Sequence, residues 1–117
     1  VTDYLKFVSD ARQITGKKRK ERMDWVIKSC GLEPVLHKKI HMLSKGYRQR
    51  VGLSQSLIYD PAILILDEPT SGLDPLQIRG IRQLIRELAK DKTIILSTHI
   101  LTEISAVYER ILVINQG

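Results

Sequence analysis

Cysteine is nearly absent from this sequence: Cys30 is the only one among 117 residues. A disulfide within the chain is therefore excluded, no cysteine cluster can hold a metal ion, and the cytoplasm is the default compartment. Apolar runs are also short, and none approaches the ~20 residues that a membrane-spanning helix needs. Residues 1–15 have neither the basic start nor the apolar centre of a signal peptide, and the chain opens on Val1 rather than Met. We therefore expect a soluble globular domain excerpted from a longer protein.

Positive charge is concentrated in one part of the chain. Residues 16–50 contain eleven Lys or Arg and only three acidic residues, so this segment carries a net +8 while the remainder carries −2. Such a cluster can mark a surface for nucleic acid, for anionic lipid or for nucleotide phosphate. The segment has only Trp25 and Tyr47 as aromatic residues and no recognisable nucleic-acid module. A solvated helix face or a membrane-proximal surface is therefore favoured over a nucleic-acid site.

The first half of the chain has the periodicity and the boundary signals of helices. Thr2 is a candidate N-cap for a first helix, Gly31 is expected to end a second, and Ser44 is a candidate N-cap for a third. A loop is expected to open at Glu33-Pro34. The three expected helices cover residues 2–12, 17–30 and 44–59, with Met23, Val26, Ile27, Cys30, Val51, Ser54, Leu57 and Ile58 facing inward.

After Pro61 the pattern changes to alternating strands and helices. The apolar run at 63–66 indicates a buried parallel strand, and Pro75 suits the first turn of a following helix. The expected elements are strand 62–67, helix 75–89 with Ile78, Ile81, Leu84, Ile85 and Leu88 on the sheet, strand 93–97, helix 101–108 and strand 110–115. The predicted fold class is α/β with parallel strands, divided into a helical subdomain at 1–60 and a sheet-forming part at 61–117.

Two carboxylates, Asp67 and Glu68, follow the apolar run directly. Ligands of an open α/β sheet bind at the carboxyl ends of its strands. In phosphoryl-transfer sites the carboxylate that closes such a strand holds Mg²⁺, and a neighbouring group orients the attacking water. Asp67 suits the first role and Glu68 the second. The alternative interpretation of this pattern is a core strand followed by a helix cap.

Two further motifs point to phosphate. Ser44 and Gly46 open the third helix, where a side-chain cap, a close backbone approach and free N–H groups together suit an anion. His99 follows the strand at 93–97, at the same sheet edge as Glu68, where an imidazole could contact a terminal phosphate or its attacking water. Each has a plain structural alternative, since many helices begin with Ser and many strands end in a polar residue.

The order of these motifs resembles that of the ATP-binding-cassette (ABC) ATPases. Leu43-Ser44-Lys45-Gly46-Tyr47-Arg48-Gln49-Arg50 is similar to their signature LSGGQxQR, and 63–68 is similar to the Walker B strand with its catalytic glutamate. Ser71-Gly72-Leu73-Asp74 resembles the D-loop and His99 the switch histidine. Lys45 and Tyr47 depart from the usual signature, a variant associated with bacterial multidrug-export and gliding-motility type subunits.

This resemblance implies a fold and a set of site residues. The fold would be a P-loop NTPase (RecA-like) core fragment preceded by the helical subdomain, and two such domains would sandwich two ATP molecules. Asp67 would bind Mg²⁺ through water, Glu68 would be the general base, and His99 would contact the γ-phosphate. The remaining implied nucleotide-site residues are Ser44, Lys45, Gly46 and Gln49 of the signature, which faces the other subunit's phosphate loop, and Asp74, which would bridge the subunits.

One motif of the family does not occur in these 117 residues. No G-x-x-x-x-G-K-[ST] sequence is present, and the resemblance places that phosphate loop (Walker A), together with the Q-loop, before Val1. We therefore expect an ATPase subunit that drives export through a separate membrane permease at the inner face of the cell membrane, with no nucleic-acid partner. The alternative is an ABC ATPase without a permease that acts on the ribosome or DNA, and the isolated fragment itself is expected to be inactive.

Overall fold

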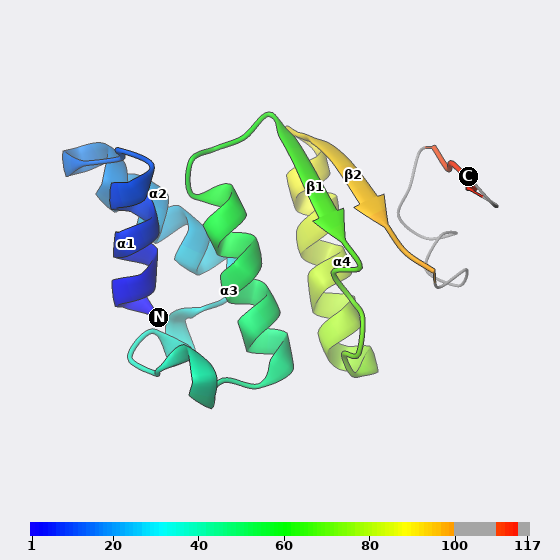
Figure 1. Cartoon of the computed structure of the whole chain (residues 1–117), viewed down its shortest axis with the longest axis horizontal. Coiled ribbons are helices and arrows are strands. Elements are labelled where there is room, and N and C mark those ends of the chain that lie inside the picture. The colour runs from blue at the N-terminus through cyan, green and yellow to red at the C-terminus, as the bar shows by residue number, and fades with distance from the viewer. Residues whose placement is uncertain (100–109, 115–117) are drawn as a thin grey trace.

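The computed structural model describes residues 1–99 and 110–114. Three helices come first: α1 (Thr2–Ala11), α2 (Gly16–Cys30) and α3 (Lys45–Leu57). They are followed by strand β1 (Ile63–Asp67), helix α4 (Pro75–Ala89) and strand β2 (Thr93–Ser97). Figure 1 shows the helical half on one side and the two strands, backed by α4, on the other.

The helix boundaries follow mostly from the signals in the sequence. Ser44 caps α3 by accepting a hydrogen bond from the Tyr47 N–H, and Gly31 ends α2 in the left-handed conformation at φ 61°. Thr2 is not the N-cap of α1, which is Val1; its hydroxyl donates instead to the Leu36 carbonyl oxygen at 3.1 Å. Thr2 therefore contributes a tertiary contact rather than a cap.

The segment between α2 and α3 is more regular than expected. In place of a plain loop at Glu33-Pro34, the chain forms a 3₁₀ turn at Glu33–Val35 and a second one at Ile40–Met42. Pro34 suits the first turn because it has no N–H that would need a partner there. Val35 is buried, so the turn also contributes to the core.

The two strands form a parallel pair with α4 as the crossover. The register runs from Ile63 opposite Thr93 to Asp67 opposite Ser97, which brings the carboxyl ends of both strands level. The side of β1 that carries Leu64 and Leu66 is buried, whereas Ile65 on the other side is 72% exposed. The expected strand is therefore present but buried on one face only, because one helical layer covers it within the described residues.

One core connects the two halves. Buried side chains of α1, α2 and α3 pack continuously with those of β1 and α4, among them Leu5, Val26, Val51, Leu57, Leu64, Ile81 and Leu84. Cys30 belongs to this core, and burial raises the pKa of its thiol to about 12. Cys30 is therefore a packing residue and stays protonated at neutral pH.

The third expected strand is not observed. Residues 110–114 have no regular structure, and Leu112 is 94% exposed. A strand needs a hydrogen-bonded neighbour, and the described sheet consists of β1 and β2 alone. Asn115 and the expected helix at 101–108 lie outside the described residues. No described helix combines the length and the apolar composition needed to cross a bilayer.

Candidate functional site

The carboxyl ends of β1 and β2 bring the predicted acidic and histidine residues together. His99 Nδ1 lies 2.6 Å from Glu68 Oε1, and the Ser97 hydroxyl donates a hydrogen bond to Asp67 Oδ1. The Glu68 N–H points at the end of β2, 3.2 Å from the Ser97 carbonyl oxygen and 3.1 Å from Ser97 Oγ. The parallel register therefore gathers four polar side chains at one edge of the sheet.

The histidine and glutamate form a partly exposed pair. The His99 side chain is 68% exposed and that of Glu68 42%, so both can reach a ligand. When Glu68 is ionised, the short contact requires a proton on Nδ1, and Nε2 takes no part in the contact. The pair holds the carboxylate in one orientation, which suits a group that accepts a proton from water.

Glu68 is held in an uncommon backbone conformation. Its φ is 42°, in the left-handed region that favours glycine, and its carbonyl oxygen accepts a hydrogen bond from the Ser71 N–H at 3.0 Å. The tight turn directs the carboxylate away from the strand and toward His99. Nothing in the apolar-run pattern of the sequence indicates this conformation.

The oxygen donors at this edge fit a magnesium ion. Among the described residues no group of three or more His, Cys, Asp or Glu side chains forms a metal cage. Mg²⁺ usually keeps several waters and binds one or two carboxylates together with substrate phosphates. Asp67 is exposed and has a second carboxylate oxygen beside the one bonded to Ser97, so it suits that role.

The predicted anion-binding residues form a second cluster at the N-terminus of α3. Gly46 is buried, and Lys45 lies over Gly72, in the loop that follows β1. Asp74 caps α4 by accepting a hydrogen bond from the Gln77 N–H at 2.9 Å. Ser44, Lys45, Gly46 and Asp74 therefore lie in two neighbouring helix starts, as Figure 1 shows for α3 and α4.

Gln49 lies apart from that helix start and faces β1. It lines a hollow of about 240 Å³ together with Asp67 and Ile65, and its Oε1 is buried without a hydrogen-bond partner in the described part of the chain. The hollow thus connects α3 with the carboxyl end of β1. A buried oxygen without a hydrogen-bond donor is costly.

Two residues that contact the candidate site residues were not predicted from the sequence. Ser97 bonds both Asp67 and Glu68, and Gln77 packs against Gly46. The register between two strands joined by a helix decides the first contact, and the packing of α4 on α3 decides the second. Neither can be read from local spacing.

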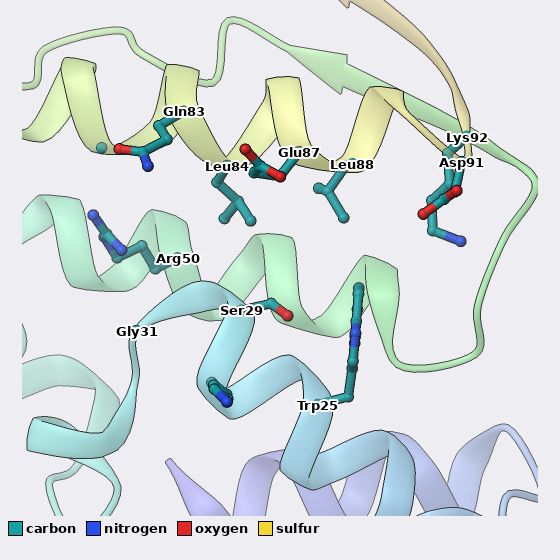
Figure 2. A pocket seen from close by; sticks show the side chains of 12 residues that line it. Trp25, Ser29, Gly31, Arg50, Gln83, Leu84, Glu87, Leu88, Asp91 and Lys92 are labelled. Atoms are coloured by element: carbon teal, nitrogen blue, oxygen red, sulfur yellow. The ribbon is translucent and has the colours of Figure 1, made fainter.

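A larger hollow lies elsewhere on the molecule. It measures about 530 Å³ and runs between α2, α3 and α4, lined by Trp25, Arg50 and Glu87 among others (Figure 2). None of the predicted site residues lines it.

Three Arg side chains of the basic segment 16–50 have hydrogen-bond partners within the chain. Arg22, Arg48 and Arg50 donate to backbone carbonyl oxygens.

Comparison with known proteins finds two family profiles. The profile described as ABC transporter matches residues 3–71, and one described as AAA domain, putative AbiEii toxin, Type IV TA system, matches residues 39–105. Together they extend from α1 to beyond β2.

Individual relatives agree with the first profile. The chain is 40% identical over 119 residues to the uncharacterized ABC transporter ATP-binding protein YhcH of Bacillus subtilis, covering 100% of this chain and 39% of YhcH. It is 40% identical over 107 residues to the bacitracin transport ATP-binding protein BcrA of Bacillus licheniformis, covering 90% of this chain and 35% of BcrA.

Among solved structures, cbiO1 of Clostridium perfringens, part of the ABC transporter complex cbiONQ, matches with a TM-score of 0.69 and 36% identity. That match covers 80% of this chain and 39% of cbiO1. The chain therefore spans less than half the length of the relatives it matches.

Proposed function

This chain belongs to the ABC transporter family of ATP-binding subunits, and we propose that it is part of a subunit that powers export through a separate membrane permease. In that subunit it would supply the signature motif and the carboxyl ends of β1 and β2, where ATP would be hydrolysed. One observation carries the hydrolytic part of the proposal. Glu68 and His99 lie 2.6 Å apart at the carboxyl edge of the parallel strands, with Asp67 beside them. This arrangement suits the attack of water on a bound terminal phosphate.

Each residue at this edge has a distinct part in the proposed reaction. Glu68 accepts the proton of the attacking water, and the short contact with His99 keeps its carboxylate in place. His99 is 68% exposed, and in the proposed complex it would contact the γ-phosphate. Asp67, held by Ser97, would hold Mg²⁺ through water, and the ion would offset the charge that develops on the phosphate oxygens.

The start of α3 is proposed to act on the ATP of a second subunit. Ser44 and Gly46 would offer the first-turn N–H groups and the helix dipole to its γ-phosphate. Lys45 would add a positive charge and Gln49 a side-chain amide, while Asp74 would bridge the two subunits. The motif order of the family supports this dimer, and the exposed position of Ser44 is compatible with it.

Export, and the multidrug-export or gliding-motility type, are the finer parts of the proposal. The name of BcrA, a bacitracin transport ATP-binding protein, favours export, and that of cbiO1 places it within a transporter complex. The subunit would then lie on the cytoplasmic face of a membrane. A ribosome- or DNA-directed ATPase without a permease is the alternative, for which the basic segment 16–50 would be the nucleic-acid surface.

The hydrolytic role can be tested with Glu68→Gln in a complete cassette that contains this chain and a phosphate loop. Turnover should fall by about 10²- to 10⁴-fold, because the base is removed while the shape is kept. Binding of MgATP, measured by calorimetry, should be retained.

Glu87→Gln is the matched control, since Glu87 is an exposed carboxylate of α4 that pairs with Lys90. It should leave both quantities unchanged. Near-normal hydrolysis by Glu68→Gln would remove Glu68 from the proposed role.

A further inference from the structure

Three glycines lie where α3 and the segment 72–80 approach each other. At each one, a long polar side chain from the opposite element lies where a Cβ atom would be. A Cβ added to Gly46 would lie 2.7 Å from the Gln77 side chain, and one added to Gly80 would lie 2.5 Å from Arg50 Nη2. A Cβ at Gly72 would collide with the end of the Lys45 side chain. We call these three contacts the glycine seam.

The seam interlocks in both directions. Two of its side chains, Lys45 and Arg50, reach from α3, whereas Gln77 reaches back from α4 onto Gly46. The contacts occur in the same order along both elements, because α3 and α4 lie side by side and run in the same direction (Figure 1). The three side chains therefore cross between the two elements at successive positions along them.

Arg50 extends the seam to a third helix. Its guanidinium donates a hydrogen bond to the Cys30 carbonyl oxygen at 2.9 Å, at the C-terminal end of α2, and lies against both Gly31 and Gly80. Figure 2 shows Arg50 on α3 between the end of α2 and helix α4. A planar group with several fixed donors suits such a junction, because it meets a carbonyl and a flat glycine surface at once.

Gln77 connects the two helix starts most directly. Its backbone N–H bonds the Asp74 carboxylate at 2.9 Å, and its side-chain amide packs on the backbone of Gly46. A displacement of the loop that carries Asp74 is thus passed to the first turn of α3 through one residue.

We propose that Gln77, whose side chain covers the buried Gly46, is the positioning residue that sets the Gly46 backbone for phosphate. This inference rests on the proposed function, in which Gly46 meets the γ-phosphate of a second subunit. It adds a residue that touches neither nucleotide nor metal and acts through Gly46.

The first test is Gln77→Ala in the complete cassette. Loss of the side chain frees the first turn of α3, and kcat should fall about 10- to 100-fold, because small misplacements of a binding group are expensive in the reaction. KM for ATP and the calorimetric affinity of the monomer should stay within about twofold. Gln77→Met, which keeps the length of the side chain, should restore most of kcat.

Leu76→Ala is the matched control, since Leu76 is the preceding residue and is 77% exposed. It should behave as the unchanged protein. A melting measurement on each variant separates loss of positioning from loss of fold, and Gln77→Met supplies the comparison if Gln77→Ala is unstable.

The second test is a suppressor. Gly46→Ala should lower kcat because its Cβ displaces the end of the Gln77 side chain from the first turn of α3, and adding Gln77→Ala should recover part of its turnover. Wild-type kcat in both Gln77 variants would overturn the positioning role. If Glu68→Gln abolishes hydrolysis in the same cassette, wild-type kcat in both Gln77 variants contradicts only the positioning role of Gln77. If Glu68→Gln remains active, the proposed function is contradicted instead.

Discussion

Asp60 shows how a single exposed carboxylate can fix the junction between the helical half and the sheet. It lies 2.6 Å from Lys92 Nζ and 3.3 Å from Arg22 Nη2, and its own backbone has φ 62°. The hydrogen bond from Lys92, followed by the charges of Arg22 and Lys92, holds the pKa of Asp60 below its usual 3.8. The folded state therefore favours the ionised carboxylate.

We expect Asp60→Asn to lower the free energy of unfolding of the chain at neutral pH by about 0.5–1 kcal/mol, the range of a favourable surface ion pair. Asn also tolerates the left-handed backbone, so the change isolates the charge. Because the folded pKa is depressed, the contribution is complete above 3.8 and is lost as the pH falls through the lower folded value. Urea titrations from pH 7 downward should show the two chains converging in acid, and a difference that persists there would contradict the ionic explanation.

The site residues that sequence alone predicted are those with local signals. Asp67 and Glu68 end an apolar run and His99 follows the next strand, so their shared edge could be inferred from the parallel βαβ pattern. Ser97 and Gln77 act through contacts fixed by register and helix packing, so no local pattern marks them. The φ of 42° at Glu68 could not be predicted from the sequence either, because turn geometry depends on both flanking elements.

At the scale of elements, the boundaries with strong chemical signals were predicted best. Helix α4 and strand β2 have the predicted bounds, since Asp74 and Pro75 define the start of the helix. The strand at 110–115 was wrong over 110–114, because an apolar pattern cannot supply the neighbour that a strand must bond. Local capping is written in the sequence, whereas sheet pairing is a property of the assembled fold.

The start of α3 carries a prediction of its own. In the complete cassette, Ser44→Arg should impair hydrolysis and ATP-driven dimerisation more than ATP binding by the monomer. Ser44 caps a helix whose first turn is proposed to meet a phosphate of the other subunit, and a bulky side chain blocks that approach. Light scattering with ATP and calorimetry on dilute monomer measure the two effects.

Ser44→Ala is the matched control for the cap itself. It removes the bond to the Tyr47 N–H at a cost of about 1 kcal/mol without adding bulk, so it should dimerise better than Ser44→Arg. Equal loss of monomer binding and dimerisation in Ser44→Arg would mean that the site acts within one subunit.

At the scale of the whole molecule, one face of the sheet is open. Ile63, Ile65 and Ile95 are 57%, 72% and 55% exposed, and the apolar residues 111–114 are exposed as well. An open apolar strand pair is a template for other chains, and a large exposed apolar surface favours association. The sequence pattern alone indicated apolar strands; their exposure follows from the single layer of helices that the described chain provides.

We expect the isolated 117-residue chain to self-associate or to be markedly less stable than a complete cassette, with residues 17–59 the better-ordered part. Replacing Ile65 and Ile95 with Thr should reduce association, because Thr keeps the strand preference and removes apolar area. Small-angle scattering and a urea titration test this. A monodisperse monomer with one cooperative transition of ordinary stability would contradict it.

The left-handed backbone at Glu68 sets thermal stability against the proposed catalytic role at a single position. A non-glycine residue in such a conformation costs of order 1–3 kcal/mol, whereas glycine adopts it freely. Selection for thermal tolerance alone would therefore favour glycine at 68, and with it the loss of the carboxylate. Directed evolution for heat resistance is thus expected to accumulate Glu68→Gly variants, which lack the proposed base, unless ATP hydrolysis is measured in every round.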